Sequence, residues 1–204
     1  IRWGEVDTLV SSEAEAVYAM QLLALGVDRA ETYLESLTLL LKRLCQAGHW
    51  IYGEAWAASS DHQGLQRTSA WFGASPEAVR AHEAIGQLAD EELQPCLMKA
   101  LRSGLAQWAC LDELLAGSRA EVMRQAGLRT WVALPIVASG DVTAVLSLYS
   151  TERQARNDPL LRRAGNMIAE CAELVHRKRE AELLRHTLNE LEAAVRERSR
   201  EVVD

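Results

Sequence analysis

The chain lacks any apolar run of about 20 residues, the length that a helix needs to cross a bilayer. Its first residues also lack the apolar stretch and small-residue cleavage site of a secretory signal. From Ile1 in first position we expect a segment of a longer protein. Together these features predict a cytoplasmic location without membrane insertion.

Positive charge is in the minority. There are 22 Lys and Arg residues against 29 Asp and Glu residues, which gives a formal net charge of -7. Nucleic-acid binding depends on clustered Lys and Arg that contact phosphates. The charge balance therefore argues against nucleic acid as a main partner.

Cysteine is sparse, and the motifs of common enzyme classes are missing. The four cysteines, Cys45, Cys96, Cys110 and Cys171, form no C-x-x-C pair, so neither a metal site nor a disulfide framework is predicted. The chain contains no G-x-x-x-x-G-K-[ST], G-x-G-x-x-G, H-E-x-x-H or G-x-S-x-G sequence. No catalytic residue is assigned, and we expect a non-catalytic chain.

Apolar periodicity predicts helices at 11–25 and 28–47, the second with a capping box at Asp28 and Glu31 and a stop at Gly48. Composition then changes to that of strands. The remaining expected elements are strands at 49–58 and 65–72, helical residues from Ser75 to Gly104, a strand at 105–111, a helix at 118–127, and strands at 129–138 and 142–151.

The strand at 49–58 alternates in side-chain size. Its small residues, Gly53 among them, fall on one face and would let a helix lie close. The large residues on the other face suit a pocket wall. Six tryptophans against one phenylalanine fit either a bulky core or an aromatic pocket, where indoles stack on flat ligands or cations. In that pocket Glu54 would accept a ligand hydrogen bond or pair with Arg67. The candidate pocket comprises Trp50, Tyr52, Glu54, Trp56, Arg67, Trp71, Trp108 and Cys110.

The last helix is expected to start at Asp158-Pro159 and to continue without a stop signal. Every seventh residue from Met167 is apolar or Ala, as in a coiled coil, with Arg198 as an interruption. Because a solitary helix would leave these leucines in water, a homodimer is predicted. The expected dimer seam is Met167, Leu174, Ala181, Leu184, Leu188, Leu191, Val195 and Val202.

Three segments carry a resemblance to a known family. They are Tyr52-Gly53-Glu54-Ala55-Trp56, then Trp108 to Asp112, and finally Ala126-Gly127-Leu128 with Ala133 to Ile136 and Ala144 to Tyr149. In this order the chain resembles GAF domains over about residues 30–175. The tail from Leu191 to Ser199 looks like helices that join sensor domains to histidine kinase or diguanylate cyclase domains.

The resemblance implies an α+β sandwich with a central antiparallel sheet, helices on both faces, a ligand cavity and a long C-terminal coiled coil. We expect an N-terminal helical segment at 1–27, the GAF domain at 28–175 and the coiled-coil helix at 176–204. The implied function is sensory: an unknown small ligand binds, and the dimeric helices relay the signal to a missing output domain.

Two other functions stay open. One is a ligand-free dimerisation or linker module, and the other is a haem or tetrapyrrole sensor. Covalent bilin attachment is not expected, because none of the cysteines considered for it, Cys45, Cys96 and Cys110, precedes a His. Haem would need His82 or His49.

Overall fold

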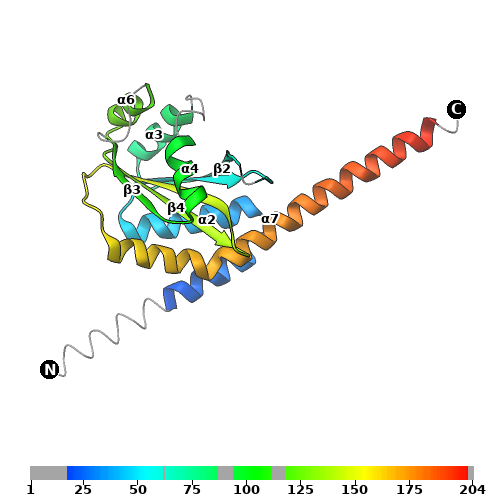
Figure 1. Cartoon of the computed structure of the whole chain (residues 1–204), viewed down its shortest axis with the longest axis horizontal. Helices are drawn as coiled ribbons and strands as arrows, with labels where there is room; N and C mark the ends of the chain where they lie inside the picture. The colour runs from blue at the N-terminus through cyan, green and yellow to red at the C-terminus, as the bar shows by residue number, and fades with distance from the viewer. Residues whose placement is uncertain (1–17, 62, 87–93, 112–117, 202–204) are drawn as a thin grey trace.

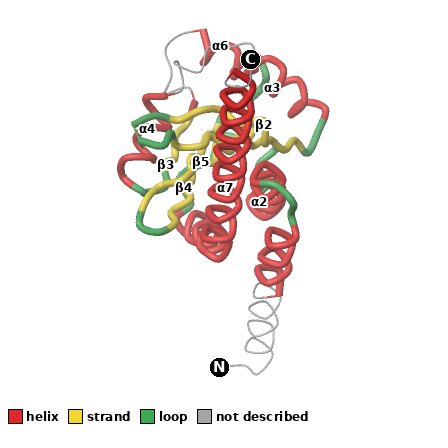
Figure 2. The backbone as a smooth tube through the Cα atoms, turned by 90° about the vertical axis from the view of Figure 1, so that its right-hand side faces the viewer, coloured by secondary structure: helices red, strands yellow, loops and turns green. Residues whose placement is uncertain are grey.

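The computed structural model describes residues 18–61, 63–86, 94–111 and 118–201. A five-stranded antiparallel sheet in the order β2-β1-β5-β4-β3 forms the centre of the molecule. Two helices, α2 and α7, cover one face, and α3, α4 and α6 lie on the other (Figures 1 and 2). The predicted α+β sandwich is confirmed.

The expected strands are present, with ends shifted by one to three residues. The turn at Ser139 and Gly140 joins β4 and β5, and both residues adopt positive φ angles there. The strands are β1 (Tyr52–Ala58), β2 (Leu65–Gly73), β3 (Gln107–Cys110), β4 (Thr130–Ala138) and β5 (Asp141–Ser150).

The helices agree with the sequence pattern in order but not in every boundary. A helix spans 18–29, and part of the helix predicted at 11–25 lies outside the described residues. Where the structure describes the helical stretch expected from Ser75 onward, it contains two helices, α3 and α4. The labelled helices are α2 (Tyr33–Gly48), α3 (Pro76–Gly86), α4 (Gln94–Ser103), α6 (Ser118–Gln125) and α7 (Asp158–Glu201).

The start of α2 corrects the predicted capping box. The N-cap is Thr32, whose Oγ1 accepts a hydrogen bond of 3.1 Å from the Glu35 N–H. The Glu35 carboxylate in turn accepts from the Glu31 N–H. Asp28 lies inside the preceding helix, and the box is formed four residues later by Thr32 and Glu35. At the other end Gly48 is the last helical residue, and the left-handed C-cap is His49.

The sheet separates two apolar cores. On the α2 and α7 face, a Cβ atom at Gly53 would lie 2.8 Å from Leu148 Cδ2 and 3.1 Å from Leu41 Cδ2. The prediction that small β1 residues let a helix lie close is therefore confirmed. The Tyr52 and Trp56 side chains belong to the other core, beneath α3, α4 and α6.

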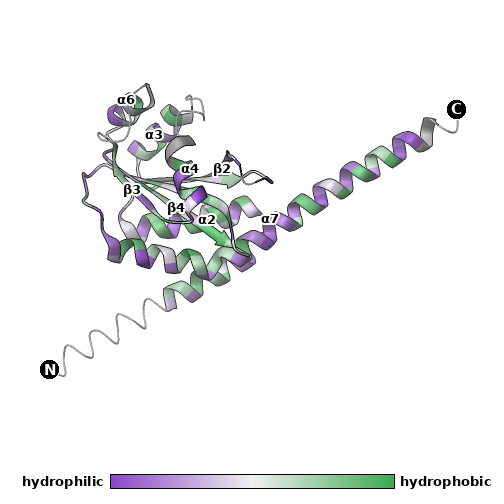
Figure 3. Ribbon diagram, in the orientation of Figure 1, coloured by the Kyte–Doolittle hydropathy of each residue, from purple (hydrophilic) through white to green (hydrophobic). Residues whose placement is uncertain are grey.

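Helix α7 has two different halves. The first packs on the sheet and α2, whereas the second extends away from the domain (Figures 1 and 2). Along the projecting half, apolar positions recur between polar ones (Figure 3). Among the described residues, none of the helices combines the length and the apolar character that a membrane span requires.

Candidate functional site

Glu54 is the centre of a buried polar cluster on the β1 face below α3. Its side chain is almost inaccessible, and both carboxylate oxygens have partners. Oε2 accepts from the Tyr52 hydroxyl at 3.0 Å and lies 3.5 Å from an Arg67 guanidinium nitrogen. Oε1 accepts from the Trp56 indole at 3.2 Å and from the Tyr149 hydroxyl at 3.1 Å. A buried carboxylate needs such partners, because its desolvation is costly.

The cluster continues across β5 to β4. The Ser147 hydroxyl donates to the Tyr149 hydroxyl at 3.0 Å, and the Trp131 indole donates to Ser147 at 2.7 Å. Sequence reasoning missed these residues as site members. The period-two alternation that placed Tyr52 and Glu54 on one face of β1 also places Ser147 and Tyr149 on one face of β5. Only the strand register, in which Ser147 lies opposite Glu54, brings the two groups together, and the sequence pattern does not specify that register.

His82 of α3 closes the cluster at its edge. Its imidazole stacks on the Trp71 indole at a centroid distance of 4.0 Å, and its Nδ1 lies 3.1 Å from the Tyr52 hydroxyl. Because Tyr52 gives its proton to Glu54, the Nδ1–H tautomer of His82 fits this contact. Burial lowers the pKa of His82, the negative charge of Glu54 opposes this shift, and the positive charge of Arg67 adds to it. Burial and the charge of Glu54 raise the pKa of Tyr52 far above its usual range.

Arg67 connects the cluster to the end of α3. Its guanidinium carbon lies 5.1 Å from the centroid of the Trp56 ring, and Nη1 donates to the Ile85 carbonyl at 3.3 Å. One side chain thus contacts the carboxylate, an indole face and a helix end. A movement of the end of α3 would therefore displace the Arg67 side chain and change its contact with Glu54.

The structure brings together five of the eight predicted pocket residues. Tyr52, Glu54, Trp56, Arg67 and Trp71 are joined by the contacts above. Whether they bind a ligand stays a prediction.

The placement of Trp50 on this face is wrong. It precedes β1, so the strand alternation does not extend to it, and its ring lies against Gly48 in the core under α2 and α7. Trp108 packs against the core on that opposite face. Cys110, two positions along β3, lies on the same side of the strand as Trp108. The Trp108 indole donates to the Gln154 carbonyl at 3.2 Å, and Cys110 Sγ lies 4.0 Å from the same oxygen.

A second polar group lies where α7 leaves the domain. The Arg179 guanidinium donates to the Thr143 carbonyl at 2.7 Å and to the Ala58 carbonyl. These carbonyls belong to β5 and to the end of β1, the strands that contain Tyr149 and Glu54. Sequence analysis did not identify these contacts, because no local signal reveals which carbonyls a distant part of the fold will present.

Neighbouring residues of α7 hold the beginning of α2. Lys178 Nζ donates to the Ala30 carbonyl at 2.6 Å and to the Asp28 carbonyl at 2.9 Å. Glu182 accepts from the Tyr33 N–H at 2.7 Å, at the positive end of the α2 dipole. We call Lys178, Arg179 and Glu182 the exit group.

The predicted dimer seam divides at the exit group. Met167 and Leu174 are partly buried against the core of the same chain. Farther along, Ala181, Leu184, Leu188, Leu191 and Val195 are exposed, from 51% for Leu188 to 64% for Val195 among the larger four. Val202 lies outside the described residues. An exposed apolar stripe of this kind is typical of a surface that a partner helix covers.

Comparison with known proteins agrees with this architecture. The family model for the GAF domain matches residues 24–177. No curated protein matches the chain.

Several solved structures share the fold. One is the GAF domain of a putative sensor histidine kinase from Pseudomonas syringae pv. tomato, with 15% identity, a TM-score of 0.59, and coverage of 89% of this chain and 99% of that one. The GAF domain of a phosphoenolpyruvate-protein phosphotransferase from Coxiella burnetii has 15% identity, a TM-score of 0.60, and coverage of 81% and 96%. The free methionine-R-sulfoxide reductase from Neisseria meningitidis, in complex with its substrate, has 12% identity, a TM-score of 0.58, and coverage of 82% and 92%. At these identities the likeness shows the fold alone.

Proposed function

Because the chain belongs to the GAF domain family, whose members are typically sensory domains of signalling proteins, we propose that it is a sensory and regulatory module. In this proposal a small molecule binds on the Glu54 face of the sheet. Its presence changes the seating of α7, and a dimeric coiled coil relays that change to an output domain.

The observation that carries the proposal is the position of Arg179. The Arg179 guanidinium donates hydrogen bonds to the carbonyls of Ala58 and Thr143. These carbonyls lie in β1 and β5, the strands that contain Glu54 and Tyr149. A shift of β1 against β5 on the ligand face would alter these two hydrogen bonds directly. The exit group thus gives the relay a short physical path.

The ligand face has the chemistry of a polar aromatic site. Trp71 and His82 offer partly exposed ring faces at the edge of the cluster, and Arg67, Glu54 and Tyr52 offer charges and hydrogen-bonding groups behind them. A flat ligand with polar edges would replace the ring stack of Trp71 on His82. To act as a signal, it must bind the two arrangements of α7 with different affinity.

A second candidate function is a ligand-free dimerisation module. The observation that favours it is the saturation of Glu54, whose two oxygens already have partners within the protein. In such a module the cluster would fix the packing of the sheet and would sense nothing. The haem or tetrapyrrole sensor, the remaining alternative, would absorb visible light after expression with haem supply.

The test combines a small-molecule screen with hydrogen–deuterium exchange. Compounds that raise the thermal unfolding midpoint are identified first, and exchange of residues 181–198 is then measured with and without them. We expect the compound to change exchange in this segment in the wild type and in Arg177→Gln, a control at an exposed neighbour. In Arg179→Gln the compound should still bind, but the change in the segment should be lost.

Two results would argue against the proposal. Stabilising compounds that leave the exchange of residues 181–198 unchanged would separate binding from relay. A broad screen without any stabilising compound would favour the ligand-free module.

A further inference from the structure

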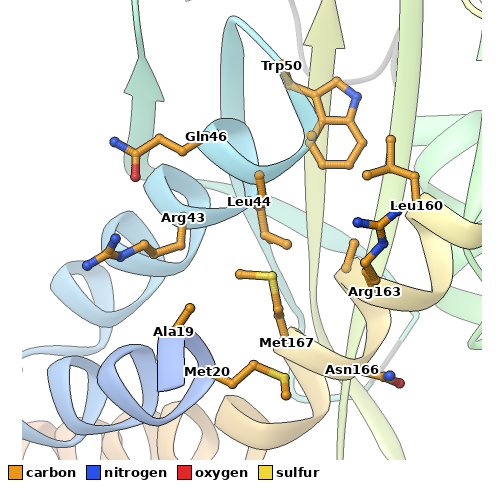
Figure 4. Close-up of a pocket in the computed structure, with 13 residues that line it drawn as sticks. Ala19, Met20, Arg43, Leu44, Gln46, Trp50, Leu160, Arg163, Asn166 and Met167 are labelled. Atoms are coloured by element: carbon orange, nitrogen blue, oxygen red, sulfur yellow. The ribbon is translucent and has the colours of Figure 1, made fainter. Parts of the chain in front are cut away.

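A cavity lies in the helical layer, on the face of the sheet opposite Glu54. It has a volume of about 490 Å³ and lies between the helix at 18–29, α2 and α7 (Figure 4). Its size falls in the range of small-molecule sites, about 300–1,000 Å³. None of the residues assigned to the Glu54 cluster lines it.

The lining is apolar with basic charge at the rim. Met20, Leu44, Leu160 and Met167 form much of the wall. Among the lining residues that the structure describes, the charged ones are Arg43 and Arg163 alone. Figure 4 shows Arg43 directed away from the centre of the cavity, whereas Arg163 lies beside Leu160 near Trp50. The charge available to an occupant is therefore positive.

Trp50 also lines the cavity, with its ring. The residue is 2% exposed, and its Nε1–H has no hydrogen-bond partner within the described ranges of the chain. The ring lies against Gly48, where a Cβ atom would be only 2.3 Å from it. In Figure 4 the six-membered part of the indole points toward the other lining residues, and the nitrogen lies on the far part of the ring. The nitrogen is closed to a molecule in the cavity, so Trp50 contributes an apolar ring to the wall.

From these features we infer that the cavity binds an amphipathic small molecule with an apolar body and one carboxylate or similar anionic group. The apolar body lies among the Leu and Met side chains. The anionic group pairs with Arg163 at the rim, a charge-assisted contact that a neutral ligand lacks. The site differs from the ligand face of the proposed function and does not depend on it.

The position of the cavity gives such a ligand influence over α7. One wall belongs to α7, and the others belong to α2 and to the helix that precedes it. A molecule held there contacts α7 upstream of the exit group. Its binding would favour the seating of α7 in which these three helices enclose it.

Octanoate is a suitable probe, with 1-octanol and octylammonium as matched neutral and cationic compounds. The protein is labelled with 15N at the tryptophan indoles, and the Trp50 signal is assigned with Trp50→Phe or, if that variant does not fold, by elimination with the other Trp→Phe variants. We expect octanoate to shift the Trp50 indole signal and to bind about tenfold more tightly than octanol, as a charge-assisted hydrogen bond allows. Octylammonium should bind more weakly than either.

Arg163→Gln should reduce the affinity for octanoate to that for octanol, without changing the affinity for octanol. Arg162→Gln is the matched control, because Arg162 is exposed on the same turn of α7 and does not line the cavity. Glu54→Gln should leave octanoate binding unchanged, which separates this site from the proposed ligand face. The inference is overturned if the Trp50 signal does not move with millimolar octanoate. It is equally overturned if acid and alcohol bind alike, or if Arg163→Gln and Arg162→Gln behave alike.

Discussion

Tyr149 donates to a buried carboxylate and accepts from Ser147, so its hydroxyl connects two strands through the Glu54 cluster. Tyr149→Phe removes that hydroxyl but keeps the ring. We expect a loss of about 1.5–3 kcal/mol in the free energy of unfolding, the range for hydrogen bonds to charged groups. Urea unfolding measures it. Tyr18→Phe, at a tyrosine that is 62% exposed, is the control and should change stability by less than about 0.5 kcal/mol.

His82 gives the cluster a pH dependence. Because burial lowers its folded-state pKa below the ordinary value of 6.5, the unfolded chain takes up the proton first. The contribution of neutral His82 to stability is therefore complete above pH 6.5. It is lost as the pH falls through 6.5 toward the lowered pKa.

Thermal unfolding between pH 8 and pH 5 tests this dependence. The wild type should lose more stability over this interval than His82→Gln. His186→Gln, at an exposed histidine of α7, should behave as the wild type. Parallel curves for the wild type and His82→Gln would contradict the assigned shift.

Gly53 sets the distance between β1 and α2. In Gly53→Ala the new methyl group would meet Leu148, Leu41 and the Cys45 thiol, all of them buried. We expect a destabilisation of about 1–3 kcal/mol from overpacking, measured by urea unfolding. Gly165→Ala is the matched control, because nothing lies within 4 Å of the added Cβ in α7. Helix propensity should make that variant up to about 1 kcal/mol more stable.

At the scale of elements, local patterns in the sequence were sufficient for most of the fold. Alternation and turn residues predicted the β4–β5 hairpin, and the period of two placed Tyr52, Glu54 and Trp56 on one face. They failed at Trp50, because a pattern does not reveal the residue at which a strand begins. They also failed at the start of α2, because the capping pattern at Asp28 and Glu31 is followed directly by a second one at Thr32 and Glu35. The helix uses the second.

The exit group and the partners of Glu54 could not be predicted in the same way. Arg179 meets carbonyls that are 36 and 121 positions away, and Tyr149 meets Glu54 across 95 positions. Such contacts depend on strand order and register, which one sequence does not specify. A local pattern within the last helix therefore does not reveal its contacts with the domain.

The exposed stripe on α7 makes the strongest prediction at this scale. Leu188→Lys places a charge in the expected seam, and we expect sedimentation to change from dimer to monomer while the domain stays folded. Asn189→Lys adds the same charge at an exposed neighbour outside the seam and should remain dimeric. An unchanged dimer mass for Leu188→Lys would mean that the globular part holds the two chains together.

At the scale of the whole molecule, the sheet separates two sites of different character. The Glu54 face is polar and internally bonded, whereas the cavity beside Trp50 is apolar with a basic rim. Helix α7 lines part of the cavity, and its Arg179 bonds to β1 and β5, the strands that contain Glu54 and Tyr149. A module with these two sites could respond to two kinds of molecule through one helix.

The continuity of α7 makes it a lever arm. From Arg179 to the last helical residue, at about 1.5 Å per residue, the arm is roughly 33 Å long. A tilt of roughly 5° at its base would therefore move the far end by roughly 3 Å, by the geometry of a rigid rod of that length. Because α7 acts as one rigid rod, a small tilt after the loss of one guanidinium hydrogen bond would move the far end of the helix by about the width of an atom.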